Sequence, residues 1–114
     1  MSDSKNTLEW YIAEKLQEID KTARPTKASG ASHEIGDISS KLFWCECKQK
    51  NSKNVIMERE EDWIKLAKRI PVHNLKEMFV AIENRFGERF IVMETEAFFR
   101  ILKLAYGEED NDEN

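Results

Sequence analysis

The sequence lacks the features that mark several large classes of protein. No apolar run approaches the roughly 18 residues of a membrane-spanning helix, so we expect no membrane partner. Residues 1–6 are polar and lack the apolar core of a signal peptide, which indicates a cytoplasmic protein, whether of cellular or phage origin. No Gly-rich phosphate loop, nucleophile elbow or serine triad is present, so the chain has no motif for those chemistries.

Cysteine and histidine are also scarce, with two of each. Cys45 and Cys47 are too far apart at Cα for an unstrained disulfide if they lie in a strand, which fits a reducing compartment. Together with the distant His33 and His73 they do not have the spacing of a zinc site. We expect both cysteines to pack as small apolar groups on the sheet face opposite Glu46.

The first half of the chain predicts a helix followed by three strands. Apolar residues at helical spacing over 8–23 predict an amphipathic helix that Pro25 ends, followed by a small, basic loop over 24–32. Alternating and β-branched residues then predict a meander of three strands. Their expected ranges are 35–39, 41–48 and 54–57.

The second half predicts a helix, two strands and a final helix. We expect a helix over 58–70, strands over 76–83 and 89–93, and a helix over 95–107. The resulting order α-β-β-β-α-β-β-α predicts one α/β (α+β) domain over residues 1–107, with helices packed on a mixed sheet. The acidic residues of 108–114 predict a solvated, disordered tail.

The segment with the most chemical information links two of the predicted strands. Side chains alternate along 41–48, so Glu46 and Lys48 project from one face, roughly 7 Å apart at Cα. Asp37 lies opposite Glu46 if its strand pairs with the next as a hairpin. Two carboxylates and one ammonium would then converge on a single sheet face.

Such a group suits Mg²⁺-dependent hydrolysis of phosphodiesters. Mg²⁺ takes oxygen ligands, so Asp37, Glu46, the Cys47 carbonyl, water and substrate phosphate could complete its octahedron. The metal lowers the pKa of bound water and neutralises charge on the phosphate, while Lys48 positions or deprotonates the attacking water. The alternative interpretation is an ordinary surface ion pair between Glu46 and Lys48, worth less than about 1 kcal/mol.

These motifs together resemble a known family. Gly36-Asp37-Ile38 followed by Glu46-Cys47-Lys48, after the loop 24–32 and a helix that contains Glu9, resembles the PD-(D/E)XK nuclease superfamily. Over residues 8–83 the chain is similar to small archaeal and phage Holliday-junction resolvases and related phage endonucleases. It departs from the pattern at Gly36, where many members have proline. The resemblance implies a restriction-endonuclease-like fold.

The resemblance also implies roles for individual residues. Asp37 and Glu46 would be the metal-binding carboxylates and Lys48 the catalytic lysine. The acid of the first helix would be Glu9, with Glu14 as a rival. At 100° per residue, Glu9 lies about 60° from the centre of the apolar stripe and Glu14 about 160° from it, which favours Glu9.

The predicted basic loop offers groups that can hold DNA phosphates. Arg24, Lys27, Ser29 and Gly30 supply a guanidinium, an ammonium, a hydroxyl and flexible backbone. In the resembled resolvases a Ser-Gly loop near the active site contacts the DNA backbone. The alternative is a solvated loop that contacts nothing, but its position next to Asp37 favours binding.

The sequence thus predicts a Mg²⁺-dependent endonuclease, with Mn²⁺ as an alternative metal, that cuts branched DNA such as four-way junctions. The resemblance implies a homodimer and products with 5′-phosphate and 3′-hydroxyl ends. Three alternatives stay open: a phage nuclease on linear duplex or single-stranded DNA, a non-catalytic DNA-binding protein of the same fold, and a protein-interaction module. The apolar residues of the last helix either pack on the sheet or form a dimer seam. They are Phe98, Phe99, Ile101, Leu102 and Tyr106.

A net charge of −4 by itself argues against DNA as a partner, but the charges are unevenly distributed along the chain. Residues 108–114 hold five acids and no base, so the rest of the chain carries 18 bases against 17 acids. Residues 21–53 alone hold seven bases and three acids, and two of those acids are the predicted metal ligands. The overall negative charge therefore conceals a basic segment suited to DNA.

Overall fold

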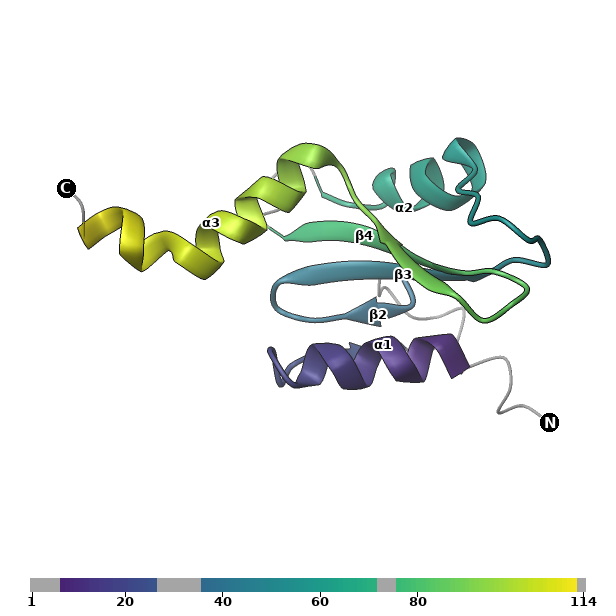
Figure 1. Cartoon of the computed structure of the whole chain (residues 1–114), viewed down its shortest axis with the longest axis horizontal. Helices are drawn as coiled ribbons and strands as arrows, with labels where there is room; N and C mark the ends of the chain where they lie inside the picture. The colour runs from purple at the N-terminus through teal and green to yellow at the C-terminus, as the bar shows by residue number, and fades with distance from the viewer. Residues whose placement is uncertain (1–6, 27–35, 72–75, 113–114) are drawn as a thin grey trace.

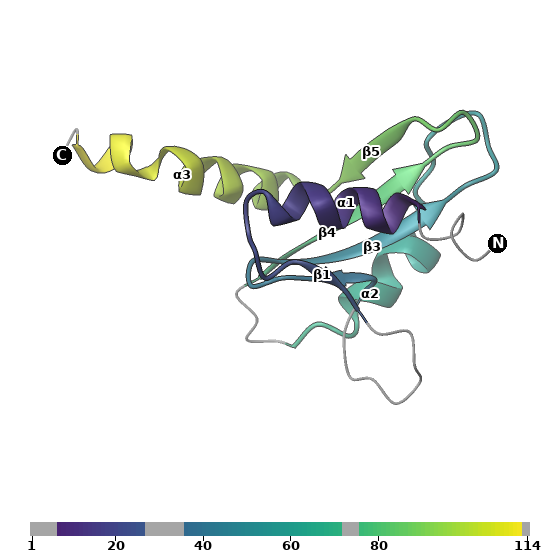
Figure 2. The same cartoon turned by 90° about the horizontal axis from the view of Figure 1, so that it is seen from below.

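The protein folds around one mixed five-stranded sheet with helices on both faces (Figures 1 and 2). The structure is a computed structural model that describes residues 7–26, 36–71 and 76–112. The element order is the one that the sequence predicts. The elements are α1 (Thr7–Gln17), β1 (Arg24–Pro25), β2 (Ile38–Ser39), β3 (Phe43–Gln49), the π-helix η2 (Arg59–Ile64), α2 (Lys65–Ala67), β4 (Glu77–Glu83), β5 (Arg89–Val92) and α3 (Thr95–Asp112).

The strands follow one another across the sheet in chain order. β1, β2 and β3 form an antiparallel meander, and β5 is antiparallel to β4. β3 and β4 are parallel, so the chain must cross over between them, and η2 and α2 make this crossover on one face of the sheet. The crossover places a helix directly beside the face from which Glu46 and Lys48 project.

α1 covers the other face and forms the main core with it. Leu8, Ile12 and Ala13 lie on the buried side of the helix, at the spacing of an amphipathic helix. The core that they share with the sheet consists of Leu8, Ile12, Ala13, Ile38, Cys45, Phe79 and Ala81. Both faces of β4 are buried, because residues 79–82 are all at most 4% exposed.

One predicted strand is wrong, and a different one takes its place. Residues 54–57 lie outside the sheet, because the preceding bend bonds instead to the β4–β5 turn: Arg85 N–H donates to Ser52 O (2.8 Å) and the Asn84 side chain to Lys53 O (2.8 Å). The meander is completed by β1, which the sequence places in a loop. Pro25 lacks an N–H, but at the edge of a sheet this omission costs no ladder hydrogen bond.

The helix boundaries also differ from the prediction. α1 ends at Gln17, because the Asp20 carboxylate accepts hydrogen bonds from the backbone N–H and the hydroxyl of Thr22 and fixes a turn there. Ile19, one of the apolar residues at helical spacing over 8–23, is consequently 77% exposed. α3 continues past the predicted end at Gly107 to Asp112, with a break in helical geometry at Tyr106. None of the helices in the described ranges is long and apolar enough to cross a membrane.

Candidate functional site

The pairing of β2 with β3 brings Asp37 beside Glu46, as the hairpin prediction requires. Ile38 pairs with Cys45 and Ser39 with Trp44, so Asp37 continues the register opposite Glu46. The Asp37 N–H donates to Cys45 O at 2.8 Å, and Asp37 Oδ2 accepts the Cys47 N–H at 2.8 Å. The carboxylate is therefore fixed to the backbone of β3 at the point where β2 begins.

Gly36 makes this close approach of the two strands feasible. Its φ of +75° lies in the left-handed region, and a Cβ placed on it would lie 2.7 Å from the carbonyl oxygen of Cys45. Proline, which is common at this position in the resembled family, has its φ fixed near −65° and could not adopt this conformation. Glycine at this position therefore has a structural reason.

Glu46 and Lys48 lie on the same face of β3, as the alternation predicts. Their side chains form an ion pair, with Nζ and Oε2 3.7 Å apart, and both are partly buried. Burial and the charge of Asp37 raise the pKa of Glu46, while Lys48 and Arg69 act in the opposite direction. The cost of ionising Glu46 beside Asp37 is what a bound cation would relieve.

Glu9 is the first-helix acid that the structure places near Asp37. Glu9 is partly buried, whereas Glu14 is exposed on the solvent side of α1. Burial, and next the charge of Asp37, raise the pKa of Glu9. Asp37 therefore acts electrostatically on Glu9 and Glu46 together, which agrees with the preference for Glu9.

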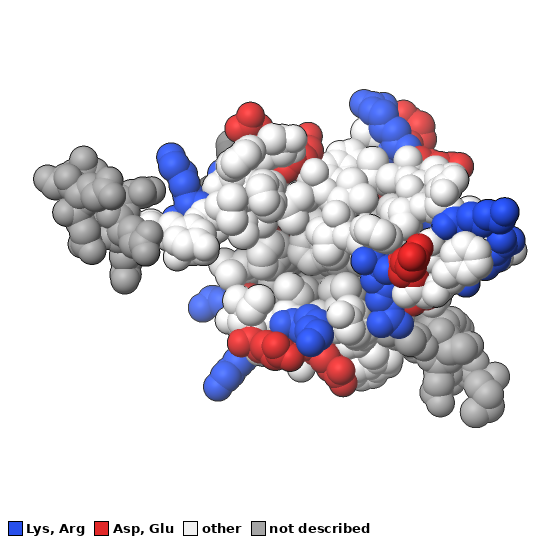
Figure 3. Space-filling view, viewed as in Figure 1, with Lys and Arg blue, Asp and Glu red and all other residues white. Residues whose placement is uncertain are grey.

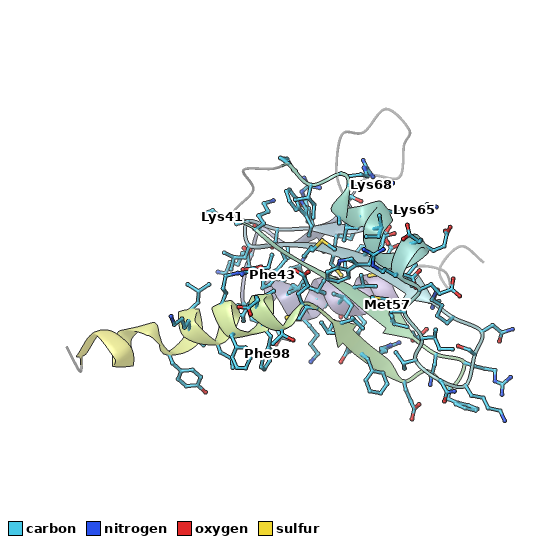
Figure 4. The ribbon with its side chains drawn as sticks, turned by 90° about the horizontal axis from the view of Figure 1, so that it is seen from above. Lys41, Phe43, Met57, Lys65, Lys68 and Phe98 are labelled. Atoms are coloured by element: carbon cyan, nitrogen blue, oxygen red, sulfur yellow. The ribbon has the colours of Figure 1, made fainter. Side chains whose placement is uncertain are left out.

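A hollow of about 330 Å³ lies beside Glu46, between β3 and the crossover helix. Sequence reasoning missed the helix residues that line it. Lys65 and Arg69 are four residues apart, and Figure 4 shows Lys65 and Lys68 extending from the helix that lies over this face. This spacing places both on one side of a helix, which is the signal in the sequence that points to them. The lining residues are Glu46, Lys48, Glu61, Asp62, Lys65, Leu66 and Arg69.

Asp62, in the same hollow, has a structural partner that the sequence does not reveal. It is 2% exposed, and its Oδ2 lies 2.7 Å from Lys50 Nζ and accepts the Glu58 N–H at 2.8 Å. Burial alone would raise the pKa of Asp62, but the hydrogen bonds from Lys50 and from the Glu58 backbone lower it. Lys50 and Asp62 therefore tie the end of β3 to the crossover helix.

The donors around Asp37 fit a hard divalent cation that keeps much of its water. Within the described ranges, no three His, Cys, Asp or Glu side chains group closely enough to hold a metal by themselves. Mg²⁺ needs only one or two carboxylates, and Asp37 Oδ1 has no hydrogen bond in the part of the chain that the structure describes. The N–H and C=O of a residue in a strand point to the same side, so the Cys47 carbonyl also faces the Asp37 edge.

The remaining predicted residues are the two cysteines and the four residues of the basic loop. Cys45 and Cys47 point to the α1 face, with Cys45 in the core and Cys47 packed against it, which confirms that they face away from Glu46. Arg24 lies on β1 and is exposed, two residues before the described end of that segment. Three predicted DNA-binding residues, Lys27, Ser29 and Gly30, lie outside the described residues.

Comparisons with family models, curated proteins and solved structures find no match to this chain.

Proposed function

We propose that the protein is a metal-dependent endodeoxyribonuclease. The observation that carries the proposal is the β2–β3 register, which holds Asp37 opposite Glu46, whose side chain forms an ion pair with Lys48. The two carboxylates repel each other and could hold Mg²⁺ between them. The neighbouring ammonium could act on the water that attacks a phosphodiester. The adjoining hollow adds Lys65 and Arg69, whose cationic groups suit a DNA phosphate.

Each residue has a role that follows from its position. Asp37, Glu46 and the Cys47 carbonyl would hold Mg²⁺ or Mn²⁺, which would supply Lewis-acid activation of water and neutralise charge at the scissile phosphate. Lys48 would orient the attacking water or take its proton, because its Nζ projects from the same face as Glu46. Arg69 and Lys65 would hold the phosphate from the helix side of the hollow.

The substrate in this proposal is branched DNA, and the active form is a homodimer. Both follow from the resemblance to the resolvases, since symmetric cleavage of a four-way junction needs two sites related by a two-fold axis. Arg24, Lys27, Ser29 and Gly30 would add contacts to the DNA backbone.

The direct test is cleavage of a labelled four-way junction and a linear duplex in the presence of Mg²⁺. Asp37→Asn keeps an oxygen that can accept the Cys47 N–H and removes only the charge, so it should fold normally and lose cleavage at least about 100-fold. Glu46→Gln should behave alike. The matched control is Glu60→Gln, which removes an exposed carboxylate from η2 and should cut at the wild-type rate. Full activity of Asp37→Asn or Glu46→Gln would refute the assignment of these carboxylates as metal ligands. Equal cleavage rates on the four-way junction and the linear duplex would instead favour a nuclease that acts on linear DNA over a resolvase.

A non-catalytic DNA-binding protein of the same fold is the second candidate. It is favoured by Lys65 and Arg69 in the hollow, whose cationic groups could hold a DNA phosphate without a metal. It predicts DNA binding that does not change on removal of Mg²⁺ or in Asp37→Asn, but weakens in Arg69→Gln. Binding measured by fluorescence anisotropy with and without EDTA separates the two candidates.

A further inference from the structure

The last helix carries an aromatic surface that faces away from the protein's own core. Phe98, Phe99 and Tyr106 are 46%, 54% and 58% exposed, and Leu102 is 36% exposed. At 100° per residue these four positions of α3 lie within an arc of about 100°. Ala97, on the other side of the helix, is 3% exposed. Among the described residues, the start of α3 thus packs through the side that carries Ala97, and the aromatic side stays largely exposed.

The shape of the molecule leaves this surface accessible along its length. α3 projects beyond the sheet, away from α1 and α2 (Figures 1 and 2). Figure 4 places Phe98 on the side of α3 that faces away from α2. In the space-filling view, a broad uncharged area lies below the start of α3, with acidic side chains above it and a basic one further along the helix (Figure 3). A second helix could therefore lie along α3 without contacting the candidate site.

The area of the aromatic surface matches what one side of a stable dimer needs. With about 200 Å² for each fully exposed large side chain, the four exposed fractions correspond to about 400 Å² of apolar surface. A standard interface buries about 800 Å² on each partner, of which somewhat more than half is apolar. This surface, together with its polar rim, is thus sufficient for association.

The charges beside the aromatic surface indicate the identity and direction of the partner. A groove of about 370 Å³ runs along this side of α3, and its charged lining residues are Glu96, Arg100 and Lys103. Arg100 pairs with Glu77 of the same chain. Lys103 forms no ion pair within the ranges that the structure describes. In an antiparallel pair of identical helices, Glu96 of each copy would lie opposite Lys103 of the other, whereas a parallel pair would align like charges.

We propose that α3 pairs antiparallel with α3 of a second copy of this chain, about a two-fold axis near its aromatic surface. Phe98, Phe99 and Leu102 form the buried centre, and Glu96 and Lys103 form two symmetric ion pairs at the rim. The pairing rests on α3 alone and does not require the nuclease activity. If both proposals hold, the dimer presents two Asp37 sites related by the same axis.

The test is the mass of the full chain in solution, measured by sedimentation equilibrium from about 1 to 200 µM. We expect a wild-type dimer, and Leu102→Glu should raise its dissociation constant by about 30-fold or more, the effect of losing an interface hot spot. Leu104→Glu is the matched control, because Leu104 lies on the opposite side of the same helix and is 77% exposed. It should leave the dimer unchanged.

Charge reversal tests the direction of the pairing. Glu96→Lys and Lys103→Glu should each weaken the dimer, and the double variant should restore it. A monomeric wild type, equal loss in Leu104→Glu, or no restoration in the double variant would overturn the proposal. DNA cleavage by Asp37→Asn is measured separately. A protein that cuts no DNA but forms the dimer would therefore refute only the nuclease proposal. Circular dichroism of each variant identifies any loss of dimer that comes from unfolding.

Discussion

Replacing Gly36 by alanine perturbs the candidate site through the backbone alone. A left-handed conformation costs a residue with a Cβ about 1 kcal/mol, and the new methyl group would lie 2.7 Å from the Cys45 carbonyl oxygen. Relief of such an overlap typically costs about 2 kcal/mol more. We therefore expect Gly36→Ala to lower the free energy of unfolding by about 3 kcal/mol, or the melting temperature by about 12 °C for a chain of this size.

Gly87→Ala is the control that isolates the overlap. Gly87 has a similar φ of +81°, but a Cβ there would have no atom within 4 Å. Its replacement should cost only the conformational contribution, about 1 kcal/mol or about 4 °C. Urea denaturation gives both values. Because relief of the overlap moves Asp37 relative to β3, cleavage by folded Gly36→Ala should also fall about 100-fold, with Gly87→Ala unaffected. Unfolding free energies within about 0.5 kcal/mol of each other would refute the steric reasoning.

Three further predictions concern charge. Lys50→Met leaves Asp62 buried without its cation, so the free energy of unfolding at pH 7 should fall by about 3 kcal/mol. Because Lys50 helps to lower the pKa of Asp62 in the fold, this loss should shrink as the pH falls toward that pKa, and a loss that does not depend on pH would contradict the assignment. Burial and Asp37 raise the pKa of Glu46, so its ionisation removes stability as pH rises. Glu46→Gln should thus be more stable than wild type at pH 7 and as stable as wild type near pH 3. Mg²⁺ should raise the melting temperature of the wild type more than that of Glu46→Gln, and an equal rise in the two proteins would argue against a metal at Glu46. Deletion of 108–114 removes five acids and should leave cleavage intact and tighten DNA binding in anisotropy assays, and weaker binding would contradict the charge argument.

The strand pattern could be predicted because its period is two. Alternation along β3 was enough to place Glu46 and Lys48 on one face and Cys45 on the other, and the hairpin then placed Asp37. The helix period likewise distinguished Glu9 from Glu14. In each case one local regularity determines which way a side chain points.

Features that depend on distant partners could not be predicted. β1 has two residues, one of them Pro25, so no local pattern distinguishes it from a loop, and only pairing with β2 makes it a strand. Asp62 has the sequence context of an exposed acid in the first turn of a helix. Its burial depends on Lys50, twelve positions earlier, whose ammonium it binds across the crossover.

The two faces of β3 link correct folding to a correct site. A shift of this strand by one residue would place Glu46 and Lys48 beneath α1 and remove Cys45 from the core. Burying those two charges would cost several kcal/mol, so chains with a misaligned site are also chains that fail to fold. A chain therefore either folds with β3 in the correct register or does not fold. Preparations should contain unfolded chains and folded chains with a correctly arranged site, and few folded chains in which the site is misaligned. Core-weakening substitutions should accordingly reduce the amount of folded protein while leaving the activity of each folded molecule unchanged.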